Sequence, residues 1–202
     1  MKGGGKTVAL TFDDGPGPST AAILAILLHF KVRATFFDIG DHEAALPALV
    51  TEQSRDGFLI GSHTWSHPYL TKLKPGAQAA QLDKTSKEQE ELTGTSPCVF
   101  RPPFGRYNGA TLALARQQHM SVWLWSDDTQ DWKADGSGSS YWVDRIIRLA
   151  ESIGITQRHP VVIMHNEAIA VPALVAALPT IIRFFEAHGY TFVDLLGRSG
   201  PP

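Results

Sequence analysis

The stretch "TVALTFDDGP", residues 7–16, ends a hydrophobic run with two adjacent carboxylates and then a glycine and a proline. Side chains alternate faces along a strand, so two neighbouring acids inside one would put a charge into the core. The turn that Gly15 and Pro16 favour ends this alternation, and both Asp13 and Asp14 can then point into the space above the strand end. The stretch therefore predicts a buried strand that ends either in a polar site or in an ordinary solvated turn.

Short apolar runs followed by longer helical patterns recur along the chain, which predicts strand–helix units around a mostly parallel sheet. Most of these runs are continuously hydrophobic, as expected for strands that are covered on both faces. Strands are expected at 7–12, 34–39, 58–61, 98–101, 121–125, 161–164 and 190–195. Helices are expected at 19–30, 43–55, 76–92, 108–118, 139–152 and 171–188, with caps at Ser19 or Thr20 for the first and at Asn108 for the fourth.

The composition fits a soluble globule, because 43% of the 202 residues are hydrophobic and 19% are charged. Residues 126–140 form the longest polar loop, and no repeat or linker divides the chain, so we expect one domain over residues 1–202. The formal net charge of −2 provides no basic surface for nucleic acid or for a membrane. A neutral or weakly charged partner fits this balance better.

The single Cys98 excludes an intrachain disulfide and a cysteine-rich metal site, so any metal must be held by histidine and carboxylate. No apolar window is long enough for a membrane span. The first residues, 1–6, lack the apolar stretch of a signal peptide.

Polar or unusual residues follow five of the expected strands at their carboxyl ends, where parallel α/β folds carry their chemistry. These segments are Asp13–Asp14, "SHTWSHP" (62–68), "RPPFGRYN" (101–108), "DTQDWK" (128–133) and "HNE" (165–167). The opposite strand ends carry mostly Gly, Lys and Gln. This asymmetry predicts one site on one rim.

In "HTWSH" the spacing of four residues would place His63 and His67 on one face of a helical turn. Two imidazoles and one carboxylate suit Zn²⁺, and Asp14 can supply the carboxylate. A structural histidine pair or a coincidence at the surface is the alternative. If Asp14 binds a metal, Asp13 is left beside it.

A spare carboxylate beside a metal-bound water is what a hydrolase needs as its general base. Asp13 can equally pair with Arg101, and both statements can hold, because an arginine partner keeps the carboxylate ionised. The two prolines after Arg101 stiffen the loop, so that the backbone amide of Phe104 can face a developing oxyanion, although a rigid surface turn is the simpler explanation.

His165 ends the apolar run 161–164, where an imidazole is either a satisfied core histidine or a proton donor for a leaving group. Asp131 can accept a hydrogen bond from the other ring nitrogen, and Trp132 offers an aromatic surface. Trp123 and Trp125 are expected in the core.

Taken together, "TFDDGP", "HTWSH", "RPPFG", "DTQDW" and "IMH" resemble, in order and rough spacing, the five motifs of the polysaccharide deacetylases, also known as carbohydrate esterase family 4 or NodB-homology enzymes. The resemblance covers about residues 7 to 195. It implies an α/β fold, a distorted (β/α)7 barrel of mostly parallel strands in a single domain, and one divalent metal, Zn²⁺ first with Co²⁺ or Ni²⁺ as substitutes. The last motif departs from many members, because Asn166 stands where they have aspartate.

By motif position, the resemblance implies Asp13 as catalytic base, Arg101 as its partner, His165 as general acid and Asp131 as the residue that tunes this acid. It further implies metal ligation by Asp14, His63 and His67, and substrate contacts by Phe104, Tyr107, Trp132 and Ile163.

The resemblance implies a chitin-deacetylase-like enzyme that removes N-acetyl groups from N-acetylglucosamine units, with chitin oligomers ahead of peptidoglycan. Xylan O-deacetylation and a catalytically silent glycan-binding domain are the alternatives. The expected partner is an acetylated glycan, without nucleic acid or membrane span. The expected protein is an extracellular or cell-wall-associated monomer.

Overall fold

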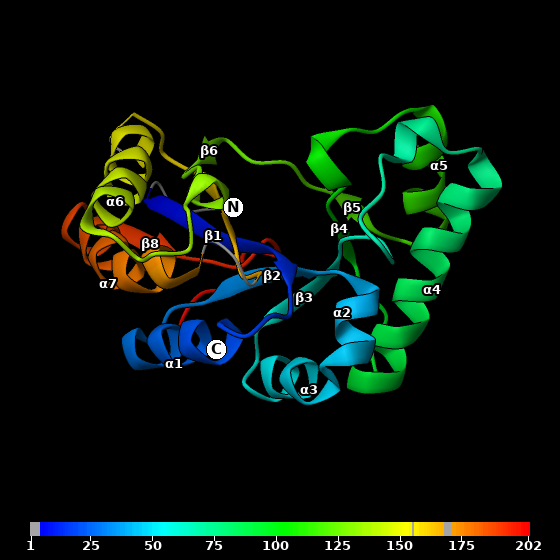
Figure 1. Ribbon diagram of the computed structural model, residues 1–202, viewed down its shortest axis with the longest axis horizontal. Helices are drawn as coiled ribbons and strands as arrows, with labels where there is room; N and C mark the ends of the chain where they lie inside the picture. The colour runs from blue at the N-terminus through cyan, green and yellow to red at the C-terminus, as the bar shows by residue number, and fades with distance from the viewer. Residues whose placement is uncertain (1–4, 155, 168–170) are drawn as a thin grey trace. The chain divides into compact units, whose positions relative to one another are not determined.

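The computed structural model describes residues 5–154, 156–167 and 171–202, and Figure 1 shows its helices and strands. Residues 1–4, on which part of the signal-peptide expectation depends, lie outside the described residues. The strands are β1 Lys6–Gly15, β2 Ala34–Asp38, β3 Leu59–Ser62, β4 Val99–Phe100, β5 Ser121–Val122, β6 Asp127–Asp128, β7 Val161–His165 and β8 Tyr190–Phe192. The helices are α1 Thr20–Phe30, α2 Gly40–Ala45, α3 Pro47–Arg55, α4 Pro75–Thr93, α5 Gly109–Gln117, α6 Ser140–Gly154 and α7 Val171–Ala187. Single 3₁₀ turns are η1 Leu70–Lys72, η2 Pro103–Gly105 and η3 Asp131–Lys133.

The strands follow the order β5-β4-β3-β2-β1-β7-β6, and β8 pairs with β1. The pairs β1–β8, β3–β4, β4–β5 and β6–β7 are all parallel. This arrangement confirms the α/β class with mostly parallel strands. By its internal contacts the described part of the chain divides into two compact units.

Unit 1 comprises residues 1–12, 18–35 and 125–202. In it α7 packs against α1 and α6. Its core includes Val8, Leu10, Leu27 and Phe185, all fully buried. The register aligns Asp127 with Val162 and Asp128 with Ile163, which sets the segment after β6 beside the end of β7.

Unit 2 comprises residues 13–17 and 36–124. Its long helix α4 packs against α2, α3 and α5. A cluster of Leu70, Leu82, Phe100, Ala115 and Met120 fills the space between α4, α5 and β4. Strand β3 needs a glycine in its middle, because a Cβ atom at Gly61 would lie 2.6 Å from Val99 Cγ2.

Three predicted elements differ from the structure. The expected helix 43–55 is divided at Leu46, whose φ of −130° is not helical, because the following Pro47 disfavours a helical residue before it. The expected strand 121–125 stops at Val122, and Trp123 and Trp125 are half-buried rather than core residues. A further short strand, β6, lies in the expected loop 126–140, where pairing with β7 overrides the low β-propensity of aspartate.

The two predicted helix caps have opposite outcomes. Asn108 Oδ1 accepts a hydrogen bond from the Thr111 amide at 3.0 Å, and Thr111 Oγ1 accepts one from the Asn108 amide, which confirms the cap. At α1 the prediction is wrong, because Ser19 makes no side-chain cap bond and Thr20 Oγ1 instead accepts from Asn166 Nδ2. Among the described residues, no helix has the length and apolarity needed to cross a membrane.

Candidate active site

The two histidines of "HTWSH" lie on an irregular loop after β3, so the predicted helical turn is wrong. The loop turns at Thr64 and His67, whose φ angles of 71° and 54° are left-handed. Thr64 Oγ1 accepts a hydrogen bond from the His67 amide at 3.1 Å and closes the loop. The two imidazole centroids nevertheless lie 4.8 Å apart, because the loop folds back on itself.

Asp14 completes a three-residue donor set in unit 2. Its Oδ1 atom lies 3.3 Å from His63 Nε2 and 3.2 Å from His67 Nε2, and one ligand atom from each residue falls within 4.8 Å of the others. His63 Nδ1 donates to the Arg101 carbonyl at 2.7 Å, which orients the ring so that Nε2 faces Asp14. Two imidazole nitrogens and one carboxylate oxygen are donors that a divalent first-row cation such as Zn²⁺ accepts.

The electrostatics of His63 favour a positive charge at this position. Burial alone would lower the pKa of His63, but the carboxylates of Asp13 and Asp14 and the Arg101 carbonyl outweigh it and raise the pKa. The donor set therefore attracts a cation, whether a proton or a metal ion.

Asp13 lies beside this set and is held by a buried ion pair. Arg101 Nη1 donates to Asp13 Oδ1 at 2.7 Å, and Asp13 Oδ2 lies 3.7 Å from His63 Nε2. Arg101 is fixed by further bonds from Nη2 to the Leu124 carbonyl and from Nε to the Trp123 carbonyl, and its guanidinium lies over the Phe37 ring. Burial lowers the pKa of Arg101, while the charge of Asp13 opposes this change.

The loop "RPPFGRYN" presents aromatic side chains next to the donor set. Phe104 adopts a left-handed φ of 58° within η2, which turns the chain sharply after the two prolines. Its ring is 46% exposed and its centroid lies 4.5 Å from that of His67. Tyr107 is 43% exposed in the same loop.

In unit 1, Asp131 clamps His165 in two ways. Its Oδ2 accepts from the His165 amide at 2.7 Å, and its Oδ1 lies 2.9 Å from His165 Nδ1. Thr129 Oγ1 lies 3.0 Å from both Asp131 Oδ1 and the Ile163 carbonyl, and so links the loop to β7. The carboxylate therefore fixes the orientation of the His165 ring.

The remaining predicted residues of unit 1 differ in exposure. Ile163 is buried, whereas Trp132 is 50% exposed and has Lys133 Nζ 4.8 Å from the centroid of its ring. The predicted site residues therefore form two groups. Unit 2 contains Asp13, Asp14, His63, His67, Arg101, Phe104 and Tyr107, and unit 1 contains Asp131, Trp132, Ile163 and His165.

Sequence reasoning missed a buried acidic pair behind the donor set. Asp38 and Glu43 are fully buried, and Gln89 donates to both the Glu43 carboxyl and the Gly61 carbonyl. Burial raises the pKa of Asp38 to about 7 and that of Glu43 to about 9. The only signal for them is the aspartate that ends the apolar run 34–38.

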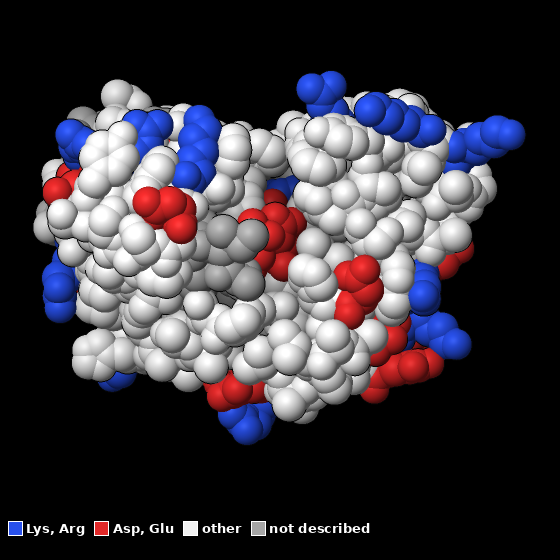
Figure 2. Space-filling model, viewed as in Figure 1, with Lys and Arg blue, Asp and Glu red and all other residues white. Residues whose placement is uncertain are grey.

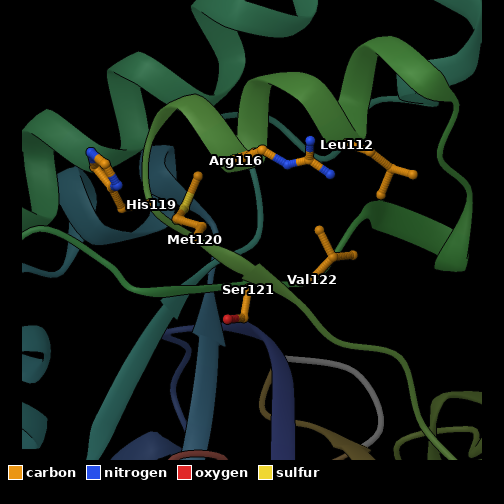
Figure 3. A pocket seen from close by; sticks show the side chains of 6 residues that line it. All are labelled: Leu112, Arg116, His119, Met120, Ser121 and Val122. Atoms are coloured by element: carbon orange, nitrogen blue, oxygen red, sulfur yellow. The ribbon is translucent and has the colours of Figure 1, made fainter.

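A separate pocket of about 440 Å³ lies between α5 and β5. In Figure 3, Leu112 and Arg116 extend from α5 above Ser121 and Val122, with His119 and Met120 at the turn between. Its lining contains one histidine and no carboxylate, so it lacks the His₂Asp donor set of the candidate site.

The parallel α/β fold carries at its strand ends a His₂Asp donor set that could hold a divalent cation and, beside it, a carboxylate paired with arginine, which is an arrangement typical of hydrolases. A family model of polysaccharide deacetylases matches residues 1–123. The chain is 35% identical over 191 residues to the peptidoglycan-N-acetylglucosamine deacetylase PgdA of Listeria monocytogenes. The matched region covers 94% of this chain and 38% of that protein.

Two solved structures resemble the whole fold. A family 4 carbohydrate esterase from Streptomyces lividans, in complex with acetate, gives a TM-score of 0.84 with 28% identity and 98% coverage of both chains. The peptidoglycan N-acetylglucosamine deacetylase Bc1960 gives a TM-score of 0.86 with 34% identity, covering 95% of this chain and 87% of that one.

This chain belongs to the polysaccharide deacetylase family, and its fold is the distorted (β/α)7 barrel that the sequence predicted. It spans 38% of the length of the Listeria relative, well under half.

Proposed function

We propose that this chain is a metal-dependent N-deacetylase that hydrolyses the acetamide of N-acetylglucosamine units in peptidoglycan and releases acetate. The observation that carries the proposal is the His₂Asp donor set with the buried Asp13–Arg101 pair beside it. This order of substrates reverses the sequence expectation, which placed chitin first, because the Listeria relative and Bc1960 are both named for peptidoglycan.

Asp14, His63 and His67 would hold one divalent cation, with Zn²⁺ first and Co²⁺ or Ni²⁺ as substitutes. When bound there, such a cation supplies Lewis acidity toward the acetamide carbonyl and lowers the pKa of a water molecule. The fit is supported by the donor set itself, because Asp14 Oδ1 lies 3.3 Å from His63 Nε2 and 3.2 Å from His67 Nε2.

Asp13 acts as the general base. Its hydrogen-bonded ion pair with Arg101 holds the carboxylate in place, so it can take a proton from the water that attacks the carbonyl carbon. The amide of Phe104, on its stiff left-handed turn, is proposed to stabilise the oxyanion that forms at the carbonyl oxygen.

His165 is proposed as the general acid on the basis of its place in the motif and of the two contacts that Asp131 makes with it. As an imidazolium it donates the Nε2 proton to the amine nitrogen while the C–N bond breaks, and its Nδ1–H stays hydrogen-bonded to Asp131 Oδ1. Asp131 stabilises the charged ring before this transfer. Trp132, Ile163 and Tyr107 are proposed as substrate contacts.

Parallel assays of acetate release from peptidoglycan, chitin oligomers and acetylated xylan test the proposal. We expect the highest kcat/KM on peptidoglycan fragments, which would also support an extracellular or cell-wall-associated site of action. Faster release from acetylated xylan would favour the esterase alternative. Binding of glycan without acetate release by the metal-loaded protein would favour the silent glycan-binding domain. That residues 1–202 act as one monomeric domain stays a prediction, which light scattering of the purified chain tests.

A further inference from the structure

A pair of stacked, exposed aromatic rings begins at the metal-ligand candidate His67. Phe104 contacts the His67 imidazole, and Tyr69 stacks on Phe104 with ring centroids 4.0 Å apart and an interplanar angle of 13°. Tyr69 is 41% exposed and Phe104 is 46% exposed. We call Tyr69 and Phe104 the aromatic ridge. Exposed aromatic surface in contact with a candidate active-site residue is the kind of surface that packs against the C–H groups of a sugar ring.

Two cations border the aromatic ridge. Lys72 Nζ lies 4.7 Å from the centroid of the Tyr69 ring, and Arg106 Cζ lies 6.0 Å from it. Both side chains are exposed. Within the described ranges, no carboxylate lies at ion-pair distance from Lys72 or Arg106, so their charges are available to a ligand. Figure 2 shows Lys and Arg side chains gathered, without an acidic neighbour, over the end of unit 2 that holds α5 and the start of α4.

This local excess of positive charge contrasts with the formal net charge of −2 for the whole chain. An anionic ligand would therefore be attracted by these particular side chains rather than by the molecule as a whole. A neutral glycan such as chitin would gain ring packing on the aromatic ridge but nothing from Lys72 and Arg106. A glycan with carboxylates gains both.

We propose that the aromatic ridge, together with Lys72 and Arg106, is a subsite that selects glycans bearing carboxylates over neutral ones. The proposal rests on the proposed function and narrows its substrate class. In peptidoglycan the carboxylate is carried either by the lactyl ether of the muramic acid unit or by the attached peptide. The lactyl ether is the nearer source on the sugar chain, and separate probes distinguish the two.

The test compares the K72Q/R106Q double variant with wild type on three probes at low salt. The probes are a peptide-free tetrasaccharide of alternating N-acetylglucosamine and N-acetylmuramic acid, the same tetrasaccharide with its peptides, and chitotetraose. We expect the ratio of kcat/KM for the peptide-free acidic tetrasaccharide over chitotetraose to fall about three- to tenfold, the range for two exposed charge contacts. About 0.5 M NaCl should remove most of the difference, because it shortens the screening length.

The matched control is K74Q. Lys74 is an exposed lysine of the same segment, but it does not lie over the Tyr69 ring. It should leave the substrate ratio unchanged. A fall only for the peptide-bearing probe would move the recognised carboxylate to the peptide and overturn the lactyl assignment. An equal ratio in wild type and in K72Q/R106Q would overturn the subsite itself.

Calorimetric binding of the same tetrasaccharides separates this proposal from the proposed function. If wild-type protein releases no acetate from any probe, the proposed function fails. The subsite still stands if wild type binds the acidic tetrasaccharide more tightly than chitotetraose and K72Q/R106Q loses this preference. The subsite proposal is wrong if wild type does not bind the acidic tetrasaccharide more tightly than chitotetraose.

Discussion

Arg101 Nη1 lies 2.7 Å from Asp13 Oδ1, and the structure buries both side chains almost completely. The pair joins the end of β1 to the loop after β4. It also fixes the carboxylate 3.7 Å from Nε2 of His63, a candidate metal ligand. One ion pair thus serves both the stability of unit 2 and the direction of the proposed base.

Removal of the carboxylate should destabilise the protein. Asp13→Ala leaves the Arg101 guanidinium buried without its counter-charge, so we expect the free energy of unfolding to fall by about 3–5 kcal/mol. The double variant Asp13→Ala/Arg101→Met should recover part of this loss, because it removes both charges. Urea unfolding of wild type, Asp13→Ala, Arg101→Met and the double variant measures the effect. A double variant less stable than the sum of the two single changes would contradict this account.

A second series of variants should distinguish the metal ligands from the general base. His63→Ala and His67→Ala each remove an imidazole donor, so we expect a large loss of bound zinc and of activity. Asp13→Asn should keep the zinc and lose turnover, because the amide cannot accept the proton. Metal content by atomic emission, measured beside acetate release, separates the two roles. His29→Ala, at an exposed histidine, is the control and should change neither quantity.

A chelator should abolish acetate release by wild type, and added Zn²⁺ should restore it. Full activity in metal-stripped protein would contradict the ligand assignment. Loss of zinc in Asp13→Asn, with a normal rate per bound ion, would mean that Asp13 and Asp14 have exchanged roles.

The buried Glu43 should make stability depend on pH. Burial, with the nearby Asp38 carboxylate, raises its pKa from 4.5 to about 9 in the folded state. Between these values the folded protein holds a proton that the unfolded chain has released, so the free energy of unfolding should fall as pH rises from about 5 to 9. Glu43→Gln should flatten this dependence and raise the melting temperature at pH 8. The exposed Glu91→Gln is the control, and parallel curves for Glu43→Gln and wild type would contradict the prediction.

The sequence predicted the fold class and the convergence of Asp14, His63 and His67, because strand ends and family motifs are encoded locally. It failed where backbone geometry or tertiary contacts decide the outcome. The left-handed φ angles of Thr64 and His67 are rare for non-glycine residues, so a helical turn was the natural prediction from the spacing alone. Asp38 and Glu43 were missed because charged residues are seldom fully buried.

The leaving group of the substrate should decide how strongly the rate depends on His165. If His165 is the general acid, it protonates the amine that departs from an acetamide, and an amine leaves poorly without a proton. An activated aryl acetate expels a phenolate that needs no proton. Because general acid catalysis contributes about 10² to 10⁴ in rate, His165→Ala should slow deacetylation of N-acetylglucosamine oligomers by about that factor. It should slow hydrolysis of the aryl ester much less.

Asp131→Asn should give a milder form of the same pattern, because Asp131 holds both the amide and Nδ1 of His165 without donating the proton itself. The exposed Asp135→Asn, four residues away, is the control, because it removes a nearby carboxylate that contacts Ser137 and not His165. Equal losses of His165→Ala on amide and ester would place His165 in a step common to both substrates, such as oxyanion stabilisation, and its role as the acid would have to be withdrawn.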